Sequence, residues 1–272
     1  MRARHLVAAL AAAVVVAGLS GEATSATPPL STLKLLQFNV LQGATGGRGK
    51  AVTAVIKASG ADVVTLDEVN DHTVFNQIAA ATGFYSMWVP GNDGYSVGIL
   101  SRFPLHDCTQ YTQAPMRHAG YGCRIKIGRS SWWIFGVHLF GFDEVVRSQE
   151  IALMMAQMNK HPRLPVVLAG DLNAQTPGEN EQKTLIVIPN LLDAGWIDSF
   201  RELYTVQQNP GFTITPPPYG QWERRIDYVF HSKLARATSA SVISTVPGYT
   251  WPSDHAALYV TLINRPPLAA TD

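Results

Sequence analysis

The sequence contains little cysteine and almost no net charge. Its 272 residues include two cysteines, 21 Lys and Arg, and 20 Asp and Glu, which gives a formal net charge of +1. A strongly basic surface that would grip nucleic acid is therefore absent. The sequence also lacks a cysteine-rich zinc motif, a His-Glu-x-x-His motif and a P-loop, since its glycine-rich stretch 43–49 has no Gly-Lys-Ser/Thr ending.

Long apolar runs are scarce as well, and the one that exists lies at the N-terminus. Two arginines precede the apolar stretch 6–19, and small residues follow it as far as Ala26. This order is typical of a secretory signal peptide, which we predict over residues 1–26, with a retained N-terminal anchor as the alternative. Residues 27–272 are then expected to form one secreted, monomeric domain.

The two cysteines, Cys108 and Cys123, stand in neighbouring predicted strands. In an exported protein, an even pair of cysteines is more often bridged than free. We therefore predict a disulfide between Cys108 and Cys123, with two buried free thiols as the alternative.

The most informative stretch is 166–174, which reads VVLAGDLNA. Its leading apolar residues predict a strand buried on both faces. Asp171 and Asn173 follow two positions apart, so they project to the same side of an extended strand end. Asp and Asn are also ordinary turn residues, and an Asx turn is the alternative to a catalytic role here.

Strand and helix patterns alternate through the rest of the domain. Many short strands between two groups of helices predict an α/β four-layer sandwich, in which two packed, mainly antiparallel β-sheets are flanked by helices. Strands are expected at 33–41, 62–69, 84–89, 95–101, 105–111, 122–127, 132–138, 166–169, 225–231, 241–246 and 256–263, helices at 50–58, 72–82 and 143–158, and loop and helix over 191–203.

Polar residues recur where the predicted buried strands end. Strand ends of a packed sheet are where a rigid scaffold brings side chains from distant parts of the sequence together. The residues at such positions are Asn39, Glu68, His138, Asp171, Asn173, Asp227, Asp254 and His255.

Part of this set suits a hard metal ion. Asn39, Glu68 and Asp254 offer oxygen ligands, which Mg2+ and Mn2+ prefer and which leave room for a substrate phosphate. Zinc bound through His138 and His255 is the alternative. The sequence predicts a Mg2+ or Mn2+ cofactor.

The other part suits attack of water on phosphorus. Asp171 is expected to orient or deprotonate the attacking water, and Asp227 to hold and charge-support His255. Hydrogen bonds from Asn173, His138 and His255 would meet the negative charge that develops on a phosphodiester.

Seven strings resemble, in order, the motifs of the endonuclease/exonuclease/phosphatase superfamily. They cover residues 33–262 and read LQFNVLQG, VVTLDEV, YSVGILSRFPL, WWIFGVHL, VVLAGDLNA, RRIDYVF and PSDHAALYV. The resemblance implies a metal-dependent phosphoesterase with Asn39 and Glu68 as the metal pair and Asp254 beside them. It also implies that Asp171 and Asn173 contact water and phosphate, and that His255 pairs with Asp227.

Three positions qualify the resemblance. Asp67 stands where the superfamily usually has Gln before the metal-site Glu68, and strand alternation predicts that it points away from the metal. Arg124 is a candidate contact to the substrate phosphate, with a surface arginine as the alternative. His118, like the other unassigned histidines, has no evident partner and is expected to be a surface or structural residue.

The sequence therefore predicts a secreted, divalent-metal-dependent phosphoesterase. A phosphodiester in a nucleic acid is the first-ranked substrate, because His138 occupies a position filled by histidine in deoxyribonuclease-like members and by tyrosine in apurinic-site enzymes. A sphingomyelinase-like or other phospholipid or phosphomonoester hydrolase is the alternative, with a membrane lipid as its partner. A catalytically silent binding module is the non-enzymatic alternative.

Overall fold

The structure is a computed structural model, and it describes residues 30–265 except 177, 180–185 and 216–221. The predicted signal peptide over 1–26 lies outside the described residues. Within them, no helix is both long and apolar enough to cross a membrane.

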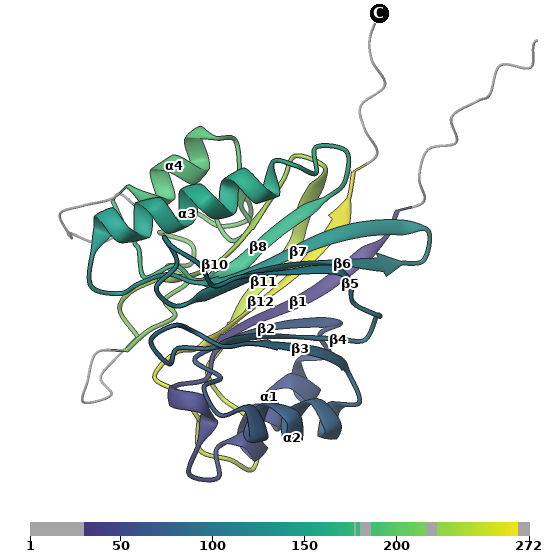
Figure 1. Cartoon of the computed structure of the whole chain (residues 1–272), viewed down its shortest axis with the longest axis vertical. Helices are drawn as coiled ribbons and strands as arrows, with labels where there is room; N and C mark the ends of the chain where they lie inside the picture. Colours follow the sequence, from purple (N-terminus) through teal and green to yellow (C-terminus); the bar gives the residue numbers. More distant parts are fainter. Residues whose placement is uncertain (1–29, 177, 180–185, 216–221, 266–272) are drawn as a thin grey trace, which may run out of the picture.

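Twelve strands form two six-stranded sheets (Figure 1). The first has the order β11 (Ala235–Ile243), β12 (Ala257–Asn264), β1 (Thr32–Asn39), β2 (Val63–Asp67), β4 (Val97–Ser101) and β3 (Tyr85–Val89). The second has the order β5 (His106–Tyr111), β6 (Ala119–Ile127), β7 (Ser130–His138), β8 (Val166–Asp171), β10 (Asp227–His231) and β9 (Ile197–Asp198). Each sheet contains one parallel pair, β1 with β2 and β7 with β8, and the other pairs are antiparallel.

The helices lie on the two outer faces of the sandwich (Figure 1). Helices α1 (Gly49–Ser59) and α2 (His72–Thr82) cover the first sheet, and α3 (Glu144–Met158) and α4 (Val187–Asp193) cover the second. A short 3-10 helix, η1 (Gln42–Ala44), follows β1. Asp143, the first residue of the helix predicted over 143–158, is the N-cap of α3, because its carboxylate accepts hydrogen bonds from the backbone N–H groups of residues 145 and 146.

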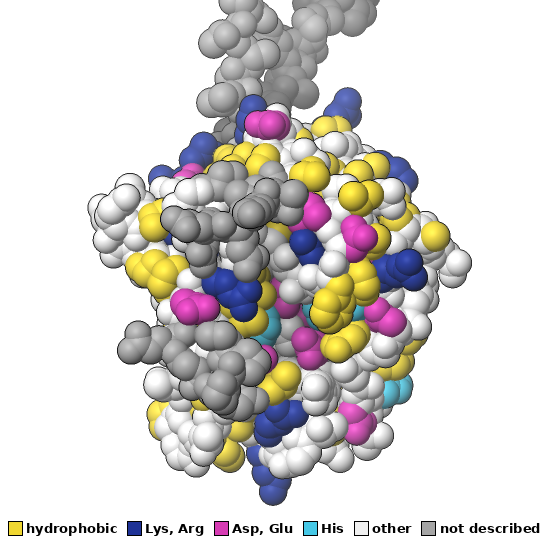
Figure 2. All heavy atoms as spheres, turned by 90° about the vertical axis from the view of Figure 1, so that its left-hand side faces the viewer, with side chains coloured by type: hydrophobic (Ala, Val, Ile, Leu, Met, Phe, Trp, Pro, Cys, Tyr) yellow, Lys and Arg dark blue, Asp and Glu magenta, His cyan; other side chains and the backbone are white. Residues whose placement is uncertain are grey.

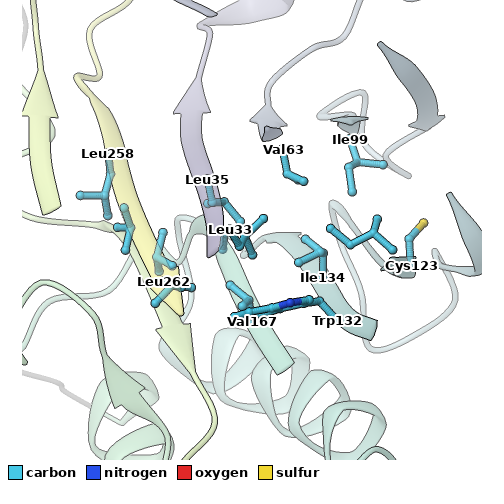
Figure 3. Packing of buried hydrophobic residues seen from close by; sticks show 14 of the residues in the cluster. Leu33, Leu35, Val63, Ile99, Cys123, Trp132, Ile134, Val167, Leu258 and Leu262 are labelled. Atoms are coloured by element: carbon cyan, nitrogen blue, oxygen red, sulfur yellow. The ribbon is translucent and has the colours of Figure 1, made fainter. Parts of the chain in front are cut away.

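Buried apolar side chains fill the space between the sheets (Figure 3). Leu33 and Leu35 of β1 point into this layer, where they meet Ile134 and Trp132 of β7 and Val167 of β8. Separate apolar clusters lie between each sheet and its helices. The four-layer α/β-sandwich prediction is confirmed, and this rigid packing fixes the strand ends on which the polar residues stand.

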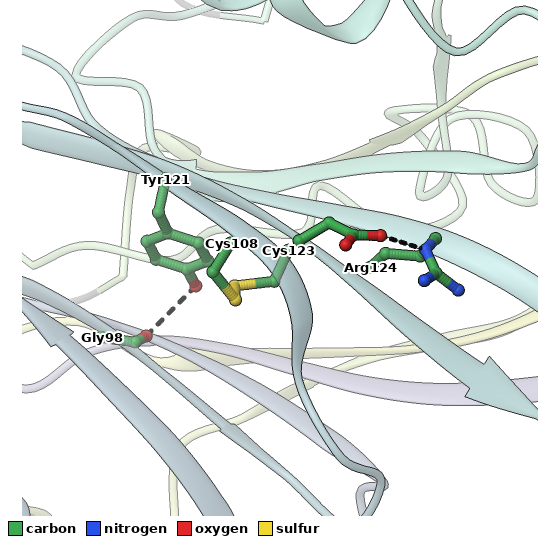
Figure 4. The surroundings of a disulfide bond; sticks show 6 residues. Gly98, Cys108, Tyr121, Cys123 and Arg124 are labelled. Atoms are coloured by element: carbon green, nitrogen blue, oxygen red, sulfur yellow. Dashed lines mark hydrogen bonds and ion pairs between the residues drawn. A yellow bond between two sulfur atoms is a disulfide. The ribbon is translucent and has the colours of Figure 1, made fainter.

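The predicted disulfide is present. Cys108 on β5 and Cys123 on β6 are bonded, with an S–S distance of 2.06 Å (Figure 4). Beside the disulfide, the hydroxyl of Tyr121 donates a hydrogen bond of 3.1 Å to the carbonyl of Gly98 in the other sheet. This edge of the second sheet is therefore held both covalently and by a contact across the sandwich.

Two predicted elements were misplaced. The range 191–203 contains the end of α4 and the short strand β9, and the helix itself begins at Val187. The strand predicted over 241–246 is β11, which begins at Ala235. The first part of β11, before residue 241, was missed because most of its exposed residues are polar and small. This part of the strand therefore contains no apolar run.

Candidate active site

The predicted site residues converge at one edge of both sheets. Asn39 ends β1, His138 ends β7 and Asp171 ends β8. Strand β10 runs antiparallel to β8, so its first residue, Asp227, is paired directly with Asp171. Glu68 follows β2, and Asp254 and His255 precede β12. Figure 2 shows a face on which acidic and histidine side chains lie in a hollow, with hydrophobic and basic side chains around it.

Asp171 lies at the centre of this cluster and is buried. Its Oδ2 accepts a hydrogen bond of 3.0 Å from Asn39 Nδ2 and lies 3.6 and 3.7 Å from the Nε2 atoms of His138 and His255. Burial and the negative charge of Asp227 raise the pKa of Asp171 to about 7, although His255 opposes the shift. A carboxyl group with this pKa can accept a proton from water near neutral pH.

His255 and Asp227 form a buried pair. His255 Nδ1 lies 2.8 Å from Asp227 Oδ2, and the other ring nitrogen faces Asp171. Burial alone lowers the pKa of His255, but the charges of Asp227, Asp171 and Asp254 and the hydrogen bond to Asp227 together raise it to about 10. The pair therefore presents a positively charged imidazole to the position that a substrate anion would take.

His138 and Asn173 form the opposite wall. Asn173 Nδ2 lies 3.1 Å from His138 Nε2 and donates a hydrogen bond of 2.9 Å to the carbonyl of Leu139. Burial, with the neighbouring His118 and His255, lowers the pKa of His138 well below its usual value, so this imidazole is neutral. Asp171 also forms the predicted alternative, an Asx turn, because its Oδ1 accepts a hydrogen bond of 2.8 Å from the backbone N–H of Asn173, so the turn and the site coexist.

Asn39 and Glu68, the predicted metal pair, are in contact. Asn39 Nδ2 donates to Glu68 Oε1 at 3.1 Å, and Glu68 Oε2 accepts from the backbone N–H of Gln42 at 2.9 Å. Ser253, next to Asp254, donates a hydrogen bond of 2.7 Å to the carbonyl of Asn39, which places the Asp254 loop beside this pair. Glu68 and Asp254 are partly exposed. Two partly exposed carboxylates beside the buried amide oxygen of Asn39 are a donor set that fits Mg2+ or Mn2+.

A second group could hold a metal ion by distance alone. Asp171, Asp227 and His255 offer ligand atoms that lie within 4.8 Å of one another, and all three residues are buried. His255 Nδ1 and Asp227 already bond to each other. The oxygen set around Glu68 therefore fits a hydrated hard cation better, because Mg2+ keeps several of its waters.

Asp67 points between the sheets, beneath Asp171. Its Oδ2 accepts hydrogen bonds from Gln37 Nε2 at 2.6 Å and from the backbone N–H of Asp171 at 2.7 Å. Burial and the charges of Asp171 and Asp227 raise its pKa well above the usual value. Asp67 therefore supports the backbone of Asp171 and is fully buried on the side away from solvent.

Arg124 does not join the site, and the prediction of a phosphate contact is corrected. Its guanidinium Nε donates a hydrogen bond of 2.6 Å to Asp107, beside the disulfide (Figure 4). In the pairing of β6 with β7, it is Ala119 that lies opposite His138. Arg124 is five positions farther along β6, which is about 16 Å at the usual rise per strand residue.

His118 is the site neighbour that sequence reasoning missed. It is 3% exposed, its Nδ1 lies 2.8 Å from the carboxylate of Asp93, and its ring centroid lies 4.3 Å from that of His138. The sequence feature that could have placed His118 near His138 is the turn at Gly128. This turn sets the register of the β6–β7 hairpin, and that register puts the start of β6 opposite His138. Asp93 carried no signal, because it lies in a loop.

A comparison with solved structures shows the same fold in several proteins. An endonuclease/exonuclease/phosphatase protein from Beutenbergia cavernae is 19% identical, with a TM-score of 0.70 over 88% of this chain and 73% of that chain. A mannosyl-6-phosphatase from Bacteroides thetaiotaomicron is 18% identical, with a TM-score of 0.68 over 85% and 99%. The human Nocturnin catalytic domain with bound sulfate is 18% identical, with a TM-score of 0.65 over 88% and 99%.

A comparison with curated proteins finds no match. The sequence model described as "Endonuclease/Exonuclease/phosphatase family" matches residues 36–255, which contain every site residue described above. Together with the shared fold and the converging strand-end residues, this match shows that the chain belongs to the endonuclease/exonuclease/phosphatase family.

Proposed function

We propose that this protein is a secreted, divalent-metal-dependent phosphodiesterase that acts by in-line attack of water on phosphorus. One observation carries the proposal: a single buried oxygen, Asp171 Oδ2, is surrounded by Asn39, His138 and His255 at the shared edge of both sheets. Members of the family are phosphoester hydrolases that use divalent metals, which supports the reaction class.

Each residue has a role that follows from its surroundings. Asp171 takes the proton of the attacking water, since its pKa lies near 7. His255, held charged by Asp227, donates a hydrogen bond to a phosphate oxygen as negative charge develops there, and Asn173 does so with the amide hydrogen that here faces His138 Nε2. Donors fixed in advance in a buried site stabilise such charge far more than water does.

The metal would be held by Asn39, Glu68 and Asp254. When bound, Mg2+ or Mn2+ polarises a phosphoryl oxygen and neutralises part of the substrate charge. The orientation of this donor set is already fixed by the hydrogen bonds of Glu68 to Asn39 and to the backbone of Gln42.

For the substrate we propose a phosphodiester of a nucleic acid. The support is His138, the histidine that deoxyribonuclease-like members have at this position. One structural neighbour is named as a mannosyl-6-phosphatase, which makes a phosphomonoester the specific alternative. Phospholipid head groups are the remaining alternative.

Secretion and a monomeric state are proposed from the sequence. The apolar stretch behind two arginines supports export, and the Cys108–Cys123 disulfide suits an oxidising compartment. Fusion of residues 1–26 to a reporter tests export, and light scattering of the purified protein tests the monomer.

The function is tested by a substrate panel with Mg2+ or Mn2+ and an EDTA control. The panel contains plasmid DNA, RNA, sphingomyelin, phosphatidylinositol phosphates and aryl phosphate mono- and diesters. We expect metal-dependent cleavage of the nucleic acids and of the aryl diester, lost in Asp171→Asn and kept in the matched control Asp193→Asn, whose side chain is exposed at the end of α4. Cleavage of the phosphomonoester or a lipid alone would reassign the substrate, and cleavage unaffected by EDTA would refute the metal-dependent mechanism.

A further inference from the structure

A row of aromatic rings leads from the candidate active site to the surface. Ring centroids are 4.3 Å apart between His138 and His118, 5.6 Å between His118 and Phe140, and 5.5 Å between Phe140 and Phe142. We call His118, Phe140 and Phe142 the aromatic row. Burial falls along it, from His118, which is buried, through Phe140, which is partly buried, to Phe142, which is 86% exposed.

The inner part of the row is fixed by hydrogen bonds. Asp93 holds the His118 ring through Nδ1. The buried carboxylate of Glu150, on α3, accepts a hydrogen bond of 2.8 Å from the backbone N–H of Phe140 and another of 2.8 Å from that of Arg117. One buried side chain therefore clamps the two backbone segments that carry His118 and Phe140.

The outer part is held as well. Arg147 donates hydrogen bonds of 3.0 and 2.9 Å to the carbonyls of Phe140 and Gly141, and its own guanidinium is paired with Glu144. The loop before Phe142 is therefore held by hydrogen bonds from Arg147, and the Phe142 ring is exposed to water. Phe142 is not an isolated exposed residue, because its ring contacts that of Phe140 and so extends an aromatic surface outward from the site.

The chemistry of the row selects its ligand. His118 is 3% exposed, so the groups that a ligand can reach are the Phe142 ring, the partly buried Phe140 ring and the exposed Arg117 guanidinium, which lies 5.9 Å from the Phe140 ring centroid. An acyl chain laid on these groups would remove polar and charged atoms from water without pairing them, which costs free energy. A nucleobase stacks on phenyl and guanidinium faces alike, and its phosphate can meet an arginine.

We propose that the outer end of the aromatic row, Phe142 with Phe140, binds an unstacked base of a single-stranded nucleic acid next to the scissile phosphate. The inference rests on the proposed phosphodiesterase function and names the strand form that it takes. Stacking contributes about 1–3 kcal/mol per base without an ion pair, so this contact does not require a strongly basic surface, which a net charge of +1 does not provide.

The test measures binding of fluorescently labelled single-stranded DNA and RNA 12-mers to the purified protein by anisotropy, in EDTA so that no cleavage occurs. Phe142→Ala should weaken binding about 5- to 150-fold, the usual effect of losing one stacked base. Phe142→Trp should bind within about threefold of wild type, and Phe142→Leu should bind as weakly as Phe142→Ala because it keeps the apolar character but loses the ring face. Tyr85→Ala is the control, since Tyr85 is a 54% exposed aromatic residue on β3.

Three results would overturn the inference: no binding by the wild-type protein, equal binding by Phe142→Ala, or recovery of binding in Phe142→Leu. Loss of binding to phosphatidylcholine vesicles in Phe142→Ala, with oligonucleotide binding unchanged, would assign the row to lipid instead. Failure of the proposed function would look different: wild-type protein with Mg2+ would not hydrolyse the aryl diester, whatever the 12-mer binding shows.

Discussion

Glu150 offers the sharpest test of how the fold holds the site. Its side chain is fully buried and accepts two backbone hydrogen bonds, from the residue before His118 and from the residue two after His138. Glu150→Ala leaves both partly buried N–H groups without their acceptor. A fully buried donor left unpaired costs about 1–3 kcal/mol, and water reaches these two in part, so we expect a loss of about 1–3 kcal/mol in total in the free energy of unfolding. Because a domain is stable by only about 5–15 kcal/mol, this loss is large.

The assay is urea denaturation followed by tryptophan fluorescence and circular dichroism. Glu150→Gln keeps one carbonyl acceptor and should lose about half as much stability as Glu150→Ala. Gln149→Ala is the matched control, because Gln149 is the exposed neighbour on α3 and should change stability by less than about 0.5 kcal/mol. If Glu150→Ala unfolded at the same urea concentration as wild type, its two backbone hydrogen bonds would not hold these segments. The claim that Glu150 fixes the inner part of the aromatic row would then be wrong.

The remaining predictions concern the catalytic pair, its charge and the disulfide. Asp171→Ala and His255→Ala should each lower turnover of the aryl diester at least about a hundredfold with an unchanged circular dichroism spectrum, and near-normal turnover in either would refute the assigned roles. In Asp227→Asn, the largest of the charges that raise the pKa of His255 is gone while burial still lowers it, so metal-free protein at pH 8 should show a neutral His255 ring by 15N NMR, against an imidazolium in wild type. An imidazolium in both proteins would contradict this origin of the shift. Replacing Cys108 and Cys123 by serine opens a loop with a sequence separation of 15 and should lower stability by about 2–4 kcal/mol, whereas an unchanged urea midpoint would show that the bond contributes nothing.

The sequence predicted those parts of the fold that apolar patterns encode. Strands such as β8, buried on both faces, appear as continuous apolar runs, and the polar residues that follow them mark the site edge. Strand β11 has one polar face and no such run, so its start at Ala235 was missed. What local patterns cannot supply is the pairing of distant strands, which puts Asp227 opposite Asp171.

The same limit explains the two residues that were misjudged. Arg124 and His118 both belong to the segment around β6, and only the register of that strand against β7 decides which of them meets His138. A strand of nine residues spans about 30 Å, so its two ends face different surroundings. Residue type favoured the arginine as a phosphate contact, and the register favours the histidine as the site neighbour.

Asp67 shows how an acidic residue is accommodated where the superfamily usually has a carboxamide. Its buried oxygen accepts from Gln37 and from the backbone of Asp171, contacts that an amide oxygen at the same point would also accept. A third ionised carboxylate beside Asp171 and Asp227 would be costly in this buried space, and the raised pKa of Asp67 means that the surroundings favour its neutral form. In that form Asp67 remains an acceptor without adding charge. The substitution therefore preserves the support beneath Asp171, whereas the next residue, Glu68, contacts Asn39 and the backbone of Gln42.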